Sequence, residues 1–266
     1  MVSKSPMDGF DSMQAASAEQ FDRQSDQYGK SHILSDTTDV SEALVGILLP
    51  RGGLALDVAT GGGHTALAIA RLGWRVIAGD VSARMLENAR KLLWEEGLEL
   101  ETSVFPAEQI PFPDNTFDLV TVRVAPHHFS SPEKFIAEVA RVLKSGGHFL
   151  LIDGTVPDND TETSEWLHQV EKWRDPTHGR FLPPAGWITL VTTNEQRIVS
   201  SRLHYKKQPD LEWYFETAAT PLENRVCVLE SVHTASPHVR QTLRINEENG
   251  RIVWWWPILT LLARKG

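Results

Sequence analysis

The amino-acid sequence predicts an α/β fold built on a doubly wound, mainly parallel β-sheet. The first observation is residues 53–71, which read as a short apolar strand, a glycine-rich turn and a helix. The second is that further apolar strands alternate with amphipathic helices as far as Asp153. The third is that this rhythm ends after Asp153, where helical patterns dominate and two more strands follow. Such alternation is typical of a parallel sheet covered by helices on both faces.

The length and composition fit one globular domain. The chain has 266 residues, of which 41% are hydrophobic and 23% are charged. We expect a disordered tail at 1–16, where the residues are small and polar, and a single domain over 17–266. Within that domain we expect lid helices at 17–50, a central core at 51–156, and a cap with the C-terminal strands at 157–266.

The net charge of −9 argues against nucleic acid or an anionic membrane as a partner. The short basic run of Arg202, His204, Lys206 and Lys207 is read as a solvated strand edge. A single cysteine, Cys227, excludes an internal disulfide and fits a reducing, cytoplasmic compartment. No signal-peptide pattern is visible, and no apolar run approaches the ~20 residues of a membrane span. We expect a monomer or a homodimer.

The elements before the core are two helices. Residues 17–32 suggest a short, weakly anchored helix followed by a turn at Gly29, and a second helix covers roughly 39–49. Their position before the first core strand suits a lid.

The turn at 57–63, Asp-Val-Ala-Thr-Gly-Gly-Gly, presents backbone N–H groups as a nucleotide site does. Gly61, Gly63 and Ala66 fit the dinucleotide pattern G-x-G-x-x-G/A, which is weak by itself. The alternative is the D/E-x-G-x-G-x-G loop that binds S-adenosylmethionine (SAM). Asp57 favours SAM, because a carboxylate repels phosphate but attracts an ammonium and a sulfonium. A loop whose glycines serve only a tight turn is the third interpretation.

The next strand, 74–78, leads into Gly79 and Asp80. Asp80 lies 23 positions (80 − 57) after Asp57, the spacing at which an acid can bind both ribose hydroxyls. The alternative is an acid favoured only by the dipole of the following helix at 83–96. Met85 in that helix is a candidate contact to ribose or adenine, although core packing is the commoner role.

The remaining elements complete the sheet and the cap. Strands are expected at 99–105, 119–125 and 148–153, and a helix is expected to begin at Pro132. After them, helical patterns fall at 161–174, 184–192, 210–218 and 221–234. Two late strands, 198–206 and 251–264, can pair antiparallel at the sheet edge. The prediction is therefore a seven-stranded sheet with an antiparallel edge strand and a helical cap.

With these residues in hand, the chain resembles the class I SAM-dependent methyltransferases, which have a Rossmann-like fold. It is most similar to the branch of ubiquinone/menaquinone C-methyltransferases. The resemblance rests on the loop 57–63, Asp80, AEQIPFPDNTFD at 107–118 and RVLKSGG at 141–147. The segments RVAPHHF at 123–129 and WRDPTHGR at 173–180 are similar to a narrower bacterial subgroup of unassigned substrate.

The resemblance implies SAM as the cofactor and assigns it a set of contacts. The glycine loop holds its methionine part and Asp80 its ribose. Pro106 replaces the usual acidic or amide residue, so only the Ala107 N–H remains for adenine. Arg123 is placed to contact the carboxylate of SAM or the substrate. The candidate cofactor contacts are Tyr28, Asp57, Ala59, Thr60, Gly61, Gly63, Asp80, Val81, Met85, Ala107 and Arg123.

Methyl transfer needs an oriented nucleophile, exclusion of water and, for some acceptors, a base. Tyr28, with Phe21 behind it, is the candidate aromatic lid over the sulfonium, and the alternative is that both rings only anchor the N-terminal helix. His127 and His128 are candidate bases, and in an extended segment at most one would face the cleft. His178 is a further candidate, although a solvated loop histidine is the simpler interpretation.

The function that we predict is methyl transfer from SAM to a small, apolar or aromatic molecule, without a metal. The tryptophans of the C-terminal part suit such an acceptor, although most of them are expected to fill the core. One alternative is a SAM-binding protein of this fold that performs no methyl transfer or another reaction. An NAD-dependent oxidoreductase is the other.

Overall fold

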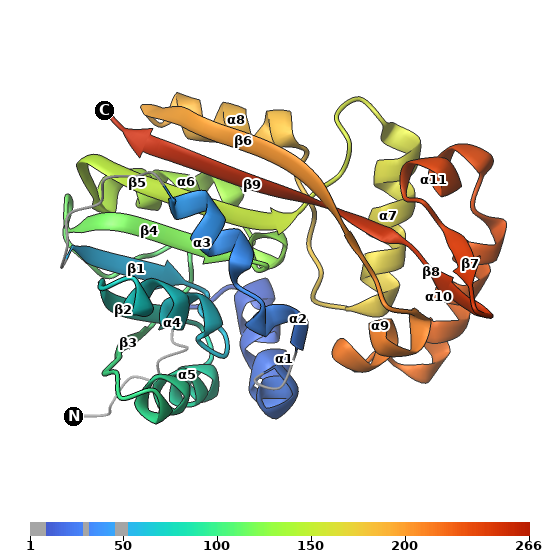
Figure 1. The fold of residues 1–266 in the computed structure, drawn as a ribbon, viewed down its shortest axis with the longest axis horizontal. Coiled ribbons are helices and arrows are strands. Elements are labelled where there is room, and N and C mark those ends of the chain that lie inside the picture. The colour runs from blue at the N-terminus through green and yellow to red at the C-terminus, as the bar shows by residue number, and fades with distance from the viewer. Residues whose placement is uncertain (1–8, 29–31, 46–52) are drawn as a thin grey trace.

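A computed structural model describes residues 9–28, 32–45 and 53–266 (Figure 1). Its centre is a seven-stranded sheet with the spatial order β3-β2-β1-β4-β5-β9-β6. In that order the strands are β3 (Glu101–Val104), β2 (Arg75–Asp80), β1 (Leu54–Val58), β4 (Phe117–Arg123), β5 (Leu143–Gly154), β9 (Trp255–Lys265) and β6 (Gln196–Lys207). The first five run parallel to one another.

The predicted mainly parallel seven-stranded sheet is confirmed. The antiparallel strand is β9, which pairs with both β5 and β6 and so lies one position in from the edge. β6 forms the edge itself, as Arg202 and Lys207 on its exposed positions suggested. Both strands continue beyond the sheet toward the cap (Figure 1).

The two faces of the sheet carry different helices because successive residues of each strand point to opposite sides. Leu56, Val120 and Leu151 pack against one helical layer, and Ala55, Leu119 and Leu150 against the other. The first layer is α6 (Pro132–Val142) and α8 (Pro184–Thr193). The second is α3 (Thr38–Leu44), α4 (His64–Arg71) and α5 (Ala83–Glu95).

The cap has its own apolar centre, in which Tyr214 and Trp254 are fully buried. It is built from helices and one hairpin, namely α7 (Thr161–Arg174), α9 (Leu211–Thr217), α10 (Leu222–Thr234), α11 (Pro237–Thr242), β7 (Asn246–Glu248) and β8 (Arg251–Val253). The sequence patterns did not reveal α11 or the hairpin. The strand expected at 251–264 is broken at Trp254, whose side chain is buried in the cap and whose carbonyl accepts from the Gln208 N–H.

The N-terminal segment forms α1 (Ser12–Tyr28) and α2 (His32–Ser35). α1 begins earlier than expected, so residues 12–16 are helical rather than part of a disordered tail. Asp11 starts the helix, because its carboxylate accepts from the N–H groups of Met13 and Gln14. Within the described ranges, no helix is both long and apolar enough to cross a membrane.

Candidate functional site

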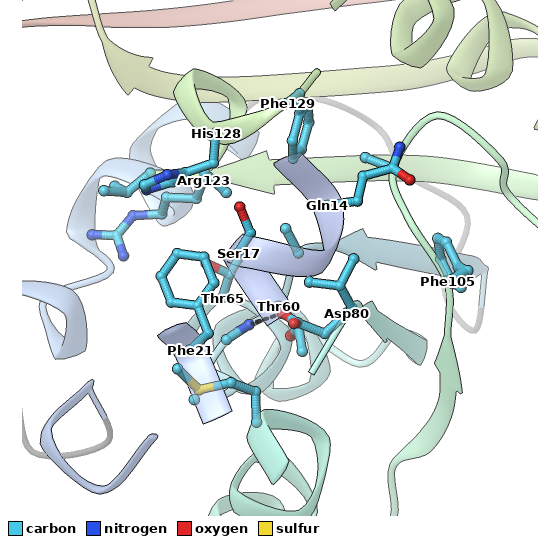
Figure 2. A pocket seen from close by; sticks show the side chains of 18 of the residues that line it. Gln14, Ser17, Phe21, Thr60, Thr65, Asp80, Phe105, Arg123, His128 and Phe129 are labelled. Atoms are coloured by element: carbon cyan, nitrogen blue, oxygen red, sulfur yellow. Dashed lines mark hydrogen bonds between the residues drawn. The ribbon is translucent and has the colours of Figure 1, made fainter. Parts of the chain in front are cut away.

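Two adjoining cavities lie at the carboxyl ends of the parallel strands. The smaller one, of about 110 Å³, lies over the glycine loop and the end of β2 and is covered by Gln14, Ser17 and Phe21 of α1 (Figure 2). The larger one, of about 950 Å³, lies between the sheet and the cap. The two share a wall of five residues, which are Phe21, Leu34, Arg123, Val124 and His128. The two cavities therefore adjoin at these residues.

Asp57 supports the glycine loop from below instead of lining the small cavity. Its carboxylate accepts from the hydroxyls of Thr60 at 2.6 Å and Thr121 at 2.7 Å. Burial raises the pKa of Asp57 to about 6, against the lowering effect of the two hydroxyls. The sequence expectation of a direct cofactor contact is thus replaced by an indirect one, through Thr60, which does line the cavity.

The loop residues differ in what their backbone does. Gly61 has φ +52° and open space where a Cβ would lie, so it forms part of the cavity wall. Gly63 has φ +88°, and a Cβ there would meet Ala89 of α5 at 2.8 Å, so it allows two helices to pack and lies outside the cavity wall. Ala59 adopts φ +52° with a side chain, a conformation that costs roughly 1–2 kcal/mol.

Asp80 is held at the end of β2 by two backbone donors. Its Oδ2 accepts from the Gly61 N–H and its Oδ1 from the Ser82 N–H, both at 2.9 Å. Burial raises the pKa of Asp80 to about 6, and the negative charge of Asp22 acts in the same direction. Val81 and Met85 line the cavity beside it, as the sequence predicted. The carboxylate is oriented and poorly solvated, which favours donors such as ribose hydroxyls.

Across the cavity, Ala107 lines the wall, and its N–H forms no hydrogen bond with any described residue. A buried donor without a partner is expensive, so this group favours a ligand acceptor. Together with Asp80 and the open Gly61, it fits an adenosine. The volume with α1 in place is smaller than typical ligand sites of roughly 300–1,000 Å³. In this arrangement α1 covers the cavity.

Arg123 differs from its expected role. Its Nε lies 3.0 Å from Asp39 Oδ2, Nη1 donates to the Leu34 carbonyl at 3.0 Å, and Nη2 donates to the Asp36 carbonyl at 2.6 Å. The side chain is only 5% exposed. All three guanidinium nitrogens therefore bind the N-terminal segment, and the residue also lines both cavities.

α1 contacts both sides of the site. Gln14 donates to Glu108 at 2.9 Å beside the small cavity, and Gln20 donates to Asp175 at 2.7 Å beside the large one. Phe21 packs edge-on against His128, with ring centroids 5.1 Å apart. The side chain of Tyr28, the other predicted lid residue, lies outside the described residues.

His127 is paired with a buried carboxylate. Its Nδ1 lies 2.8 Å from Asp153 Oδ1, and its backbone N–H donates to Oδ2 at 3.0 Å. Because the carboxylate only accepts, Nδ1 carries the proton and Nε2 is left as an acceptor. Burial alone would lower the pKa of His127, but the charge and hydrogen bond of Asp153 outweigh it and raise the pKa.

His128 has the opposite character. Burial and the neighbouring His127 lower its pKa to about 3, so it is neutral at physiological pH. Its Nδ1 lies 3.1 Å from the Thr177 carbonyl. The expectation that only one of the pair faces the cleft is wrong, because Pro126–His128 is a 3₁₀ turn rather than an extended segment. Both rings line the large cavity, with centroids 4.2 Å apart.

The segments 123–129 and 173–180, which the sequence singled out separately, lie against each other. The His127 carbonyl accepts from the N–H groups of Gly179 at 2.9 Å and Arg180 at 3.0 Å. A Cβ at Gly179 would come within 2.8 Å of that carbonyl, which explains the glycine. His178 is buried at 2% exposure, so its interpretation as a solvated loop histidine is wrong.

Aromatic side chains form much of the wall of the large cavity: Phe21, Phe181, Tyr205, Trp213 and Trp256. The buried Glu171 fixes part of this wall by accepting from Trp256 Nε1 at 2.8 Å and the Tyr214 hydroxyl at 2.7 Å. Trp187 and Trp254 are core residues, as expected for most tryptophans. His204 and Lys206 also line the cavity, so the basic run is only partly a solvated edge.

Two residues of the site had no signal in the sequence. Val124 has φ +53°, a conformation that is strained for a β-branched residue, and it lines both cavities. Asp153 was expected only as the end of a strand, and its partnership with His127 depends on the β4–β5 pairing. Within the described part of the chain, no group of three potential ligand side chains is arranged to hold a metal ion.

Comparison with known proteins gives consistent matches. The Methyltransferase domain family matches residues 56–151. The uncharacterized methyltransferase YcgJ of Bacillus subtilis is 33% identical over 198 residues, which cover 74% of this chain and 78% of YcgJ. Its crystal structure aligns with a TM-score of 0.78 at 28% identity, over 86% of this chain and 98% of that one.

Two further matches agree with these. A Bacillus halodurans crystal structure aligns with a TM-score of 0.80 at 30% identity, covering 86% of this chain and 99% of that one. The ubiquinone/menaquinone biosynthesis C-methyltransferase UbiE of Marinomonas is 30% identical over 166 residues, which span 60% of this chain and 62% of UbiE.

Proposed function

The chain belongs to the SAM-dependent methyltransferases, and from this premise we propose that it methylates a weakly acidic hydroxyl group of a small aromatic molecule. The observation that carries the proposal is the His127–Asp153 pair. His127 lies in the wall of the large cavity, and its ring is next to that of His128, which lines both cavities. An acceptor that is already nucleophilic, such as a neutral amine, would need no such pair.

The small cavity is the proposed SAM site. Asp80 would bind the ribose hydroxyls, the Ala107 N–H the adenine, and the wall at Thr60 and Gly61 the methionine part. When bound there, SAM supplies a methyl group on a sulfonium, whose bond to sulfur breaks with both electrons as the new bond to the acceptor forms. Asp57 is proposed to act on this site through Thr60, and Arg123 by holding the N-terminal segment beside the wall that it helps to form.

The large cavity is the proposed acceptor site. Its volume of about 950 Å³ lies at the upper end of the range for small-molecule sites. Its aromatic wall favours a flat or apolar acceptor, since rings stack offset or edge-on with a gain of roughly 0.5–1.5 kcal/mol per pair. Val124 and His128 lie on the shared wall, so the hydroxyl to be methylated would be placed beside them.

The base is proposed to be His127 Nε2. Asp153 holds the ring in one tautomer, directs Nε2 away from itself and stabilises the imidazolium that forms. The acceptor O–H bond breaks, its proton passes to Nε2, and the oxygen takes the methyl group. Positioned general bases contribute typically 10²–10⁴ in rate. His128 is less suited to take this proton, because burial and the neighbouring His127 lower its pKa.

A carbon acceptor activated by a neighbouring hydroxyl is the second candidate. The observation that favours it is the similarity to UbiE, which is named as a C-methyltransferase. The same base would remove the hydroxyl proton, and the methyl group would bind to the ring carbon as its bond to sulfur breaks. The hydrogen on that carbon would then leave as a proton and the oxygen would take a proton back, which restores the aromatic ring. Mass spectrometry with NMR of the product distinguishes an aryl ether from a ring methyl group.

The experiment is a methyl-transfer assay with SAM on phenols, catechols and quinols, with His127→Asn and Asp153→Asn as variants. We expect both variants to lose roughly 10²–10⁴ in kcat and to bind S-adenosylhomocysteine as wild type does. His238→Asn is the matched control, because His238 pairs with Asp160 at 2.8 Å on the surface. Activity of His127→Asn within a few-fold of wild type would refute the proposal.

Calorimetry with SAM addresses the cofactor site separately. Binding that is lost in Asp80→Ala supports the assignment of the small cavity. SAM binding without turnover on the whole panel would instead favour a protein of this fold with another SAM-site reaction.

A further inference from the structure

His127 and His128 present two hydrogen-bond acceptors side by side in the wall of the large cavity. The Asp153 carboxylate lies 2.8 Å from Nδ1 of His127, and the Thr177 carbonyl lies 3.1 Å from Nδ1 of His128. Both partners can only accept, so each ring carries its proton on Nδ1 and keeps a lone pair on Nε2. The two residues are consecutive in one 3₁₀ turn, and their ring centroids are 4.2 Å apart. One small ligand can therefore meet both rings.

Asp175 adds a third acceptor beside His128 in the same cavity wall. Its Oδ1 is occupied, since it accepts from Gln20 Nε2 at 2.7 Å and from the N–H and the hydroxyl of Thr177 at 2.8 and 2.7 Å. Its Oδ2 accepts from no residue of the described ranges and lies 4.0 Å from His128 Nε2, too far for a direct hydrogen bond. Two acceptors that face each other in this way lack a donor, and a ligand hydroxyl placed between them can donate to either.

We propose that the methyl acceptor is a small aromatic molecule with hydroxyl groups on two neighbouring ring carbons, of which one is methylated and the other donates to His128 Nε2 or Asp175 Oδ2. The inference rests on the proposed function and deepens it, because it takes His127 as the base. The first hydroxyl loses its proton to His127 Nε2 and takes the methyl group, as the bond between that group and sulfur breaks. The second hydroxyl keeps its proton throughout.

The surroundings of the two histidines fit an aromatic frame that carries polar groups at one edge. Phe21 and Phe181 line the same cavity, with ring centroids 5.1 Å from that of His128 and 5.0 Å from that of His127. Burial, and then the charge of His127, lowers the pKa of His128, so its Nε2 lone pair stays available as an acceptor. His128 also lines the small cavity, where a charged ring would repel a sulfonium.

The second hydroxyl sets the specificity of the site. An acceptor that lacks it leaves His128 Nε2 and Asp175 Oδ2 without a donor, and buried acceptors left unpaired weaken the binding of that molecule. The methylated product has an ether oxygen in place of one hydroxyl, so it can no longer donate at both positions. We therefore expect one methyl group for each acceptor molecule, with the monomethyl ether as the product that accumulates.

The test compares kcat/KM for catechol, its 1,3-isomer resorcinol and phenol, with SAM as the methyl donor. We expect wild type to prefer catechol to each of the others by roughly 10- to 100-fold, the effect of an unpaired buried acceptor. Asp175→Asn keeps an oxygen for Gln20 and Thr177 and places an amide N–H₂ at the position of Oδ2. His128→Phe keeps a ring but removes its nitrogens. In both variants the preference should fall to within about threefold, because the acceptor for the second hydroxyl is lost.

His168→Phe is the matched control and should keep the preference, because His168 is a half-buried histidine outside the wall of both cavities. Equal turnover of catechol and resorcinol by wild type, or an unchanged preference in Asp175→Asn, overturns the inference and leaves the proposed function in place. Calorimetry on the enzyme loaded with S-adenosylhomocysteine decides without turnover: catechol should bind more tightly than resorcinol in wild type only, and equal binding or none overturns the inference. Activity in His127→Asn would instead refute the proposed function.

Discussion

Arg123→Met should open the N-terminal segment rather than remove a cofactor contact. The guanidinium binds the Leu34 and Asp36 carbonyls and the Asp39 carboxylate, and it is almost fully buried. Its loss leaves Asp39 without its partner and two carbonyls without a donor. Breaking a buried pair in this way costs about 3–5 kcal/mol. The substitution should lower the free energy needed to open residues 34–45 locally, because these contacts join that segment to the sheet.

Hydrogen exchange measures this effect directly. The amides of Val40, Ser41 and Val45 form the hydrogen bonds of α3, and their protection reports its opening. A loss of 3–5 kcal/mol corresponds to faster exchange by about 10²–10³, since 1.4 kcal/mol is tenfold. Arg123→Lys keeps the positive charge but cannot form the three hydrogen bonds of the planar guanidinium. The α3 amides of this variant should therefore exchange at an intermediate rate.

The control is Arg71→Met. Arg71 pairs with Glu96 at 2.7 Å, but both side chains are exposed, so its removal should change exchange little. Unchanged protection of α3 in Arg123→Met, together with a large loss of SAM affinity, would refute the reasoning. It would show that Arg123 binds the cofactor carboxylate, as the sequence suggested.

Three further variants test the site. Asp80→Asn should stabilise the free protein at pH 8 by roughly 1–2 kcal/mol. Because the pKa of Asp80 is raised from 3.8 to about 6, folding with this carboxylate charged costs about 3 kcal/mol. The asparagine lacks one hydrogen-bond acceptor, which offsets the gain in stability by about 1 kcal/mol. The folded state binds the Asp80 proton more tightly than the unfolded state does. The gain in stability of Asp80→Asn, measured by urea unfolding, should therefore shrink as the pH falls from 6 toward 4. A gain that persists at pH 4 contradicts the raised pKa. Ala59→Gly should relieve the backbone strain at φ +52°. Glycine also makes the unfolded chain more flexible, which opposes this gain, so the stability should change by less than about 1 kcal/mol. Weaker SAM binding in calorimetry would count against this prediction. Gly179→Ala should displace the His127 carbonyl and lower kcat more than SAM affinity; equal kinetics would show that this contact does not align the base.

The parts of the site that could be predicted from sequence are those fixed by local backbone. Gly61 and Asp80 follow consecutive strands at a characteristic spacing, and parallel strands bring their carboxyl ends together. The alternation of strands and helices predicted the parallel sheet for the same reason, because the periodicity of each element is visible within its own residues.

The parts that could not be predicted depend on contacts between distant segments. Arg123 has the chemistry of an anion ligand, and only the position of residues 34–39 reveals that each of its guanidinium nitrogens donates to that segment. The orientation of His127 and His128 follows from a single 3₁₀ turn, which no periodicity shows in three residues. The burial of His178 depends on the packing of the cap, for which the chain has no repeated pattern.

With SAM and the acceptor bound as proposed, the contacts of α1 would couple the binding of the two ligands. Gln14 and Phe21 cover the cofactor pocket, while Gln20 and Gln24 hold the same helix to Asp175 and the Ala218 carbonyl of the cap. If one ligand favours one position of this helix, the affinity for the other must change. Linkage makes this effect reciprocal, so the factor by which SAM alters acceptor affinity equals the factor by which the acceptor alters SAM affinity.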